Sequence, residues 1–161
     1  MRTVVTANRQ PPGPPPAPIY RAAVHESGHA VLALLLGLRV NTVWVVGEAG
    51  GGGCEVSESR EFDADAFERL AIATWGGNVA EEIVFGQGRP IDNTSDEEDL
   101  LELAGIVHPG DPHRQRAFLD RTRAQAMRRV AQYRATIERL AGLLVRRGRL
   151  SGDQVQSMLR G

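Results

Sequence analysis

The run His-Glu-Ser-Gly-His at residues 25–29 is the part of the sequence with the clearest chemistry. On a helix, the imidazoles of His25 and His29 lie on one face, one turn apart, where both can bind a single Zn²⁺ ion. Glu26 can then reach the open side of the metal and accept a proton from a metal-bound water as that water attacks a carbonyl. The spacing therefore predicts a hydrolytic zinc site with His25 and His29 as ligands and Glu26 as general base.

The alternative is a chance match to this pattern on a buried amphipathic helix. The motif runs directly into an apolar stretch over residues 30–36. A glutamate and two histidines beside such a stretch are costly in a protein core unless something satisfies them. A metal ion would do so, and this favours the metal site.

The composition of the chain limits the classes of protein to which it can belong. The chain has 161 residues, which fits one domain with a proper core, and its net charge of −1 gives no electrostatic reason to expect a nucleic acid or an anionic membrane as partner. The single cysteine, Cys54, excludes an internal disulfide framework and fits a reducing compartment. The longest apolar run, over residues 30–38, is too short to span a bilayer, and no apolar signal core follows the N-terminus. We expect a cytoplasmic protein without a membrane segment.

The chain divides into a tail and one folded domain. Residues 1–18 are rich in proline and predict an extended polyproline II tail or linker, and residues 19–161 predict the domain. A first helix should reach about residue 38, and the β-branched and aromatic run 40–46 predicts a strand. We expect the glycines at 50–53 to form a mobile turn before a returning strand at 54–57.

The rest of the domain predicts helices. They are expected over residues 63–85, 96–107 and 112–147, with a last short helix from Ser151, whose spacing to Gln154 is that of a capping box. Gly76 and Gly77 inside the second helix cost stability, which suggests close packing against another helix or the metal site. The fold class is mainly α with a small β-hairpin.

Four blocks of the sequence resemble, in order, the peptidase domain of FtsH-type AAA membrane metalloproteases. Residues 25–31 resemble the family's H-E-A-G-H-A-V, with Ser27 in place of Ala, and residues 76–86 resemble its G-G-R-x-A-E-E-x-x-F-G. Residues 94–96 stand where the family has a small or polar residue followed by a zinc-ligand aspartate that opens a helix. Residues 140–144, with 150–152, resemble its closing helix-turn-helix.

This resemblance covers about residues 20–161 and implies a helical zincin-like metallopeptidase domain that stands alone. The family normally carries a transmembrane segment and an AAA ATPase ahead of this domain, and we expect neither here. The sequence has no G-x-x-x-x-G-K-[ST] pattern and no lysine to serve one. The loop at residues 92–95 also departs from the family's Thr-x-Gly-Ala run. These departures argue against processive unfolding of proteins and leave the hydrolytic residues in place.

The resemblance implies an aspartate as third zinc ligand, and two candidates remain. Asp96 lies ten residues after Gly86, close to the family's spacing, and the apolar residues four, seven and eight positions on would keep it on a buried stripe. Asp99 is three residues further on, and with Leu100 it echoes the family's common Asp-Leu or Asp-Ile pair. We favour Asp96, with Asp99 second and Glu81 or a neighbour as the remaining possibility.

Glu81 and Glu82 are predicted to support the site without binding the metal. They follow Gly76-Gly77 on a helix that should pack against the first one, where a carboxylate can hold the far nitrogen of a ligand histidine. The alternative is a surface acidic pair. His108 and His113 lie outside any ligand-like spacing and are expected to be surface or capping residues.

The residues predict a zinc-dependent endopeptidase that acts on peptides or unfolded polypeptide without ATP. An extended substrate could pair with the strand at 40–46 or with its partner at 54–57. A non-proteolytic adaptor that retains zinc is the first alternative, although a structural zinc has no use for a base such as Glu26. A small-molecule metal hydrolase is the second, and a closed pocket would favour it. A homo-oligomer and a separate ATPase partner both remain open.

Overall fold

The structure is a computed structural model that describes residues 17–58, 61, 63–88 and 94–161. The described residues form five helices and three strands: α1 Pro18–Leu35, β1 Arg39–Val46, β2 Gly51–Ser57, α2 Ala64–Phe85, α3 Ser95–Val107, α4 Pro112–Arg147, β3 Arg149–Ser151 and α5 Gly152–Arg160. The mainly helical class with a small antiparallel sheet is confirmed. Most of the predicted tail lies outside the described residues, but Pro18 belongs to the domain, because it opens α1.

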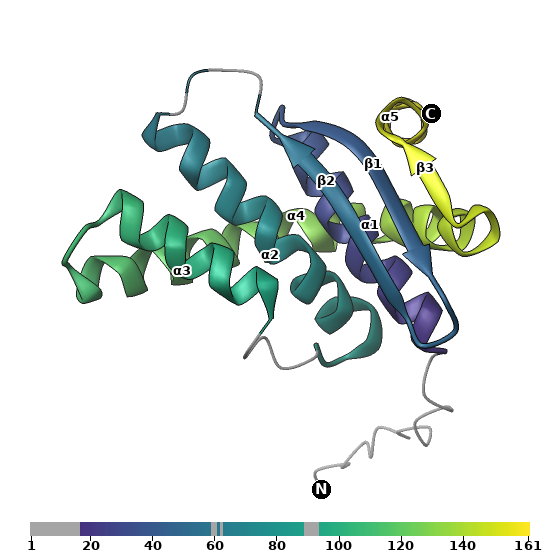
Figure 1. Cartoon of the computed structure of the whole chain (residues 1–161), viewed down its shortest axis with the longest axis horizontal. Helices are drawn as coiled ribbons and strands as arrows, with labels where there is room; N and C mark the ends of the chain where they lie inside the picture. The colour runs from purple at the N-terminus through teal and green to yellow at the C-terminus, as the bar shows by residue number, and fades with distance from the viewer. Residues whose placement is uncertain (1–16, 59–60, 62, 89–93) are drawn as a thin grey trace, which may run out of the picture.

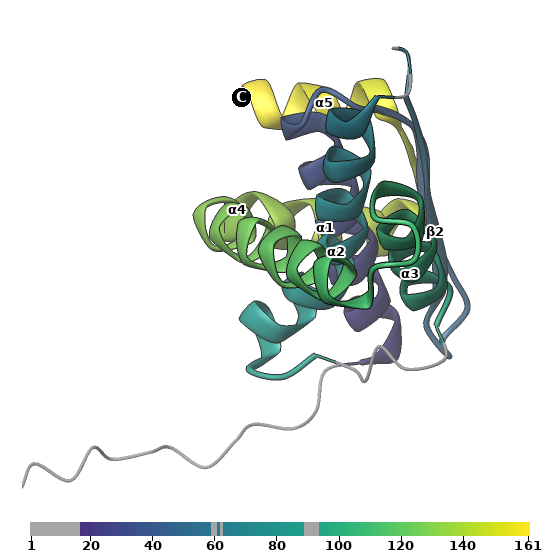
Figure 2. The same cartoon turned by 90° about the vertical axis from the view of Figure 1, so that its left-hand side faces the viewer.

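Helix α1 lies at the centre of the molecule. It packs against β1 and β2 on one side and against α2 and α4 on the others, so that it lies between the sheet and α4 (Figures 1 and 2). Its alanines, valines and leucines supply much of the main core, including the buried run at residues 30–33. The most buried helix of the domain therefore carries residues 25–29.

Helix α1 ends at Leu35, three residues earlier than predicted. Gly37 has a φ of +75°, and the next N–H, that of Leu38, donates to the carbonyl of Ala33 at 2.9 Å. The N–H of Gly37 donates to Leu34 at 3.1 Å, which completes a Schellman ending. The glycine stops the helix, so Leu38 begins the connection to β1 although it is apolar.

The sheet has the order β2-β1-β3, and both pairings are antiparallel. The predicted turn over the glycines at 50–53 is wrong, because Gly51 already belongs to β2 and the turn spans residues 47–50. Glycines 51–53 pair with residues 44–46 of β1, and a side chain of β1 lies close to where each of these three glycines would carry a Cβ. The third strand was not predicted, because three residues are too few to show a periodicity.

Helices α1 and α2 are in close contact, and this contact holds residues 25–29 against α2. A Cβ on Gly28 would collide with the backbone carbonyl of Gly76, and a Cβ on Gly76 would lie 2.6 Å from the carbonyl oxygen of Gly28. The two helices therefore approach each other at a pair of glycines, as the pair Gly76-Gly77 suggested. Helix α2 begins after Asp63, which caps it by accepting from the N–H of Ala66, and it ends at Gly86, where φ is +83°.

Capping side chains mark the starts of α3 and α5. Thr94 caps α3 by accepting from the N–H of Glu97, and Ser151 and Gln154 form the predicted capping box of α5. Helix α4 is long and is interrupted at Tyr133, where the backbone leaves helical angles. None of the described helices combines the length and the apolar character needed to cross a membrane.

Candidate metal centre

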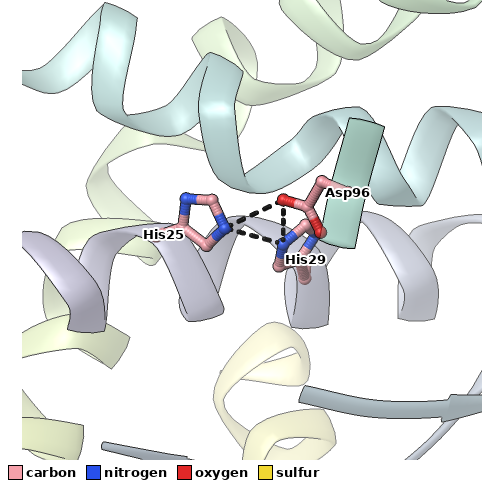
Figure 3. A group of neighbouring side chains, drawn as sticks. All are labelled: His25, His29 and Asp96. Atoms are coloured by element: carbon pink, nitrogen blue, oxygen red, sulfur yellow. Dashed lines mark hydrogen bonds and ion pairs between the residues drawn. The ribbon is translucent and has the colours of Figure 1, made fainter. Parts of the chain in front are cut away.

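Three predicted side chains meet in the structure: His25 and His29 of α1 and Asp96 of α3 (Figure 3). The two Nε2 atoms of the histidines lie 3.0 Å apart. The Oδ2 atom of Asp96 lies 3.1 Å from Nε2 of His25 and 3.3 Å from Nε2 of His29. A tetrahedral Zn²⁺ with bonds of about 2.0–2.1 Å holds its ligand atoms roughly 3.3 Å apart, so the cluster has the dimensions of a zinc site.

Both histidines are oriented by hydrogen bonds from Nδ1, the ring nitrogen that faces away from the cluster. Nδ1 of His29 donates to the backbone carbonyl of Ala73 at 2.9 Å, and Nδ1 of His25 donates to Oε1 of Glu81 at 2.7 Å. With the proton on Nδ1, a neutral imidazole presents the lone pair of Nε2 to the cluster. This is the tautomer that a metal ligand needs in each ring.

Burial, hydrogen bonds and nearby charges shift the pKa values of His25 and Asp96 in opposite directions. Burial lowers the pKa of His25, but its hydrogen bonds to Asp96 and Glu81 and the charge of Glu26 outweigh burial and raise it to about 9. Burial likewise raises the pKa of Asp96, but the hydrogen bond from His25 and the proximity of His29 hold it well below its ordinary value. At neutral pH, Asp96 is therefore already ionised, and a metal ion would displace the second proton of His25.

Asp99 does not join this cluster. It is exposed and lines the same pocket as Asp96, one turn further along α3. Partial burial and the negative charge of Asp96 raise its pKa. The structure thus brings Asp96, the favoured candidate, to the histidines and leaves Asp99 at the rim.

Glu81 and Glu82 differ in their surroundings. Glu81 is fully buried, and besides His25 it contacts Arg21, whose Nε donates to Oε2 of Glu81 at 2.5 Å. Arg21 also donates to the backbone carbonyl of Gln87 at 2.9 Å, so the guanidinium is anchored on both sides. Glu82 forms an ion pair with Arg123 of α4 instead. This arrangement supports the predicted role for Glu81 and gives Glu82 a different partner.

Glu81→Gln should weaken zinc binding by about 10–100-fold, because the amide cannot stabilise the positive charge that builds up on His25 when it binds a metal. Glu82→Gln is the matched control: it removes the same charge one residue away and should leave the affinity unchanged. Competition with a coloured zinc chelator measures both. Equal affinities for the two variants and the wild type would assign Glu81 a purely structural role.

His25, His29 and Asp96 line a pocket of about 540 Å³. Helix α1, both long strands, α2 and the start of α3 form its walls. The lining residues besides the three of the cluster are Glu26 of α1, Trp44 of β1, residues 52–54 and 56 of β2, Leu70, Ala73, Thr74, Asn78 and Glu81 of α2, and residues 94, 95 and 99 at the start of α3. Gly52 lies against Glu26, because a Cβ on this glycine would be 3.1 Å from Cγ of the glutamate. The candidate general base is therefore next to the backbone of β2.

Cys54 also lines the pocket but is not part of the cluster. Burial, and after it the negative charge of Glu26, raises the pKa of the Cys54 thiol well above its ordinary value. The thiol therefore stays protonated at neutral pH. Its sulfur does not join the ligand atoms of His25, His29 and Asp96, so nitrogen and oxygen form the donor set of the cluster.

Sequence reasoning missed two supports of the site. The carbonyl of Ala73 has no signal in a sequence, since every residue carries one. Arg21 does have one, because it precedes His25 by four residues and so shares its helix face. A basic residue at that position would neutralise a carboxylate held behind the histidine.

The geometry of this site is the feature of the chain that indicates a function. No protein-family model matches the chain, and no curated protein matches its sequence. The arrangement of His25, Glu26, His29 and Asp96 within the pocket is therefore the basis of the proposals that follow.

Proposed function

We propose that this chain is a zinc-dependent endopeptidase that hydrolyses unfolded or flexible polypeptide without ATP. One observation carries the proposal: His25, His29 and Asp96 converge beside Glu26 in a pocket bordered by β2. The resemblance of residues 25–31 and 76–86 to FtsH-type peptidase domains supports the same activity.

His25, His29 and Asp96 are the residues that would hold the metal. Zinc supplies a Lewis acid that polarises a carbonyl and lowers the pKa of water. Glu26 is the proton carrier of the proposed reaction, because its carboxylate can take a proton from the attacking water and later deliver it to the leaving amine. Glu81 and the Ala73 carbonyl keep the two imidazoles oriented while this happens.

The sheet supports an extended peptide as the substrate. Of the two strands predicted to accept a peptide, β1 is central: it pairs with β2 along its length and with β3 over residues 42–44. It is therefore not available there for strand addition. β2 is an edge strand of the described sheet, and its residues 52–54 line the pocket next to Glu26. A peptide that pairs with β2 would pass directly over the candidate metal ligands.

The proposal extends to the cellular location of the protein. Cys54 suits a reducing compartment, and we infer a cytoplasmic location. We also propose that the site cleaves unfolded polypeptide without ATP, since the residues that would carry out the hydrolysis include no nucleotide-binding pattern.

The test is cleavage of a permanently unfolded protein by the zinc-loaded chain, without nucleotide. We expect Glu26→Gln to lower the rate by at least about 10²–10⁴-fold while zinc remains bound, because it removes the base and no ligand. Glu98→Gln, which removes an exposed charge in the first turn of α3, should cleave like the wild type. A zinc-loaded wild type that cleaves neither an unfolded protein nor a peptide library would contradict the proposal and favour a zinc-retaining adaptor.

A further inference from the structure

We propose that Trp44 selects the substrate by binding an aromatic or bulky apolar side chain next to the scissile bond. This inference rests on the proposed peptidase function, because it assigns the side-chain preference of the same site. Trp44 belongs to β1, which is not the strand at the edge of the sheet, yet it lines the pocket.

The indole of Trp44 lies across Gly53. The two residues are directly paired between β1 and β2, and a Cβ on Gly53 would lie 2.7 Å from Cη2 and 3.0 Å from Cε2 of the ring. The far end of the indole therefore occupies the place where residue 53 would otherwise have its own side chain. Only a glycine leaves that place empty.

This arrangement extends the reach of β1 to a peptide bound on β2. Neighbouring strands lie about 4.7–4.9 Å apart, so a peptide paired with β2 would be roughly 9–10 Å from β1. A side chain that stands upright on β1 would not reach it. The indole of Trp44 does extend over β2, so its outer edge would face the side chain of a bound peptide.

The contact would fall next to the reacting bond. Gly52 faces Glu26, as the 3.1 Å between its notional Cβ and Cγ of Glu26 indicates. Successive residues of a strand point to opposite faces, so Gly53 faces the outer side of the sheet together with Trp44. A peptide with its scissile bond beside Gly52 would then place an adjacent side chain beside Gly53 and against the indole.

The surroundings of the ring define the chemistry of the preferred side chain. The guanidinium carbon of Arg149 lies 5.1 Å from the centroid of the indole, and Arg149 is paired with Trp44 in the sheet. The outer edge of an indole attracts the face of another aromatic ring and packs against large apolar groups. The nearby positive charge disfavours lysine and arginine at the same position.

A randomised peptide library tests the proposal, with cleavage sites read by mass spectrometry. The wild type should show Phe, Tyr, Leu or Met enriched, and Lys and Arg depleted, at one position beside the cleaved bond. Trp44→Ala should remove this preference and raise KM roughly 10-fold for a Phe peptide, with little change in kcat. Trp44→Phe, which keeps an aromatic strand residue with a shorter reach, should weaken the preference in the same direction. An unchanged preference in both variants would overturn the proposal and leave Trp44 the role of covering Gly53.

A second measurement does not depend on catalysis. The chain has two tryptophans, and Trp75 donates to Thr122 of α4, outside the residues that line the pocket. A Phe-containing extended peptide added to Glu26→Gln should shift the tryptophan emission, and a Lys-containing one should not. The double variant Glu26→Gln/Trp44→Phe should lose the shift. A shift without any cleavage by the wild type would contradict the peptidase function alone, whereas no shift with either peptide would overturn the role of Trp44.

Discussion

Asp96→Asn should abolish stable zinc binding, whereas Asp99→Asn should leave it intact. The amide keeps the size of Asp96 but removes the anionic oxygen that lies 3.1 Å from Nε2 of His25 and 3.3 Å from Nε2 of His29. We expect the affinity to fall by more than about 100-fold, beyond the effect of losing a supporting residue. Asp99 is exposed and lies beyond the first turn of α3, so its replacement should change the free energy of unfolding by no more than about 0.5 kcal/mol.

Chelator competition on both variants measures this difference, and the activity on an unfolded protein should follow it. The two substitutions change the same charge on the same helix, three residues apart, so each is the control for the other. Zinc binding that survives Asp96→Asn but is lost in Asp99→Asn would reverse the assignment of the third ligand.

Gly77→Ala should destroy the site without removing a candidate ligand. A Cβ at this position would lie 2.5 Å from Nε2 of both His25 and His29, so the added methyl group would occupy the space in which the two ligand atoms meet. Because α2 is already in contact with α1 at Gly76 and Gly28, the helix cannot move away to relieve the collision. We expect zinc affinity to drop at least as far as in Asp96→Asn.

Gly105→Ala is the matched control, since Gly105 also lies inside a helix but has nothing within 4 Å of its notional Cβ. This change should stabilise the protein by about 1 kcal/mol, because alanine favours the helix over glycine, and zinc binding should not change. Thermal unfolding and zinc titration of both variants provide the comparison. Normal zinc affinity in Gly77→Ala would contradict the close approach of α2 to the two imidazoles.

The local parts of this fold could be predicted from the sequence. A spacing of four residues places His25 and His29 on one helix face whatever the rest of the chain does, and Ser151 with Gln154 specifies a helix start by itself. The glycines at 51–53 misled the prediction because glycine favours turns, whereas here they extend a strand whose space is filled by side chains of β1. The side chains that fill this space belong to another strand, so nothing in the sequence around the glycines predicts them.

The choice between Asp96 and Asp99 shows where sequence reasoning stops. Both residues lie near the start of the same helix, and the apolar pattern allows either to face inward. The decision depends on how α3 is rotated against α1, about 70 residues away in the chain. Packing of Leu100 and Ala104 into a small core with Ala71 and Phe118 sets that rotation. It is a tertiary property, and only the structure supplies it.

X-ray absorption at the zinc edge identifies the ligands of the metal centre, because it reports the atoms bound to zinc in the loaded protein. We expect two imidazole nitrogens and light oxygen donors at about 2.0–2.2 Å, with no sulfur, and the loss of one imidazole in His29→Ala. A scattering shell at about 2.3 Å would indicate a bond to the sulfur of Cys54. That shell, or a spectrum without imidazole, would contradict a metal centre built from His25, His29 and Asp96.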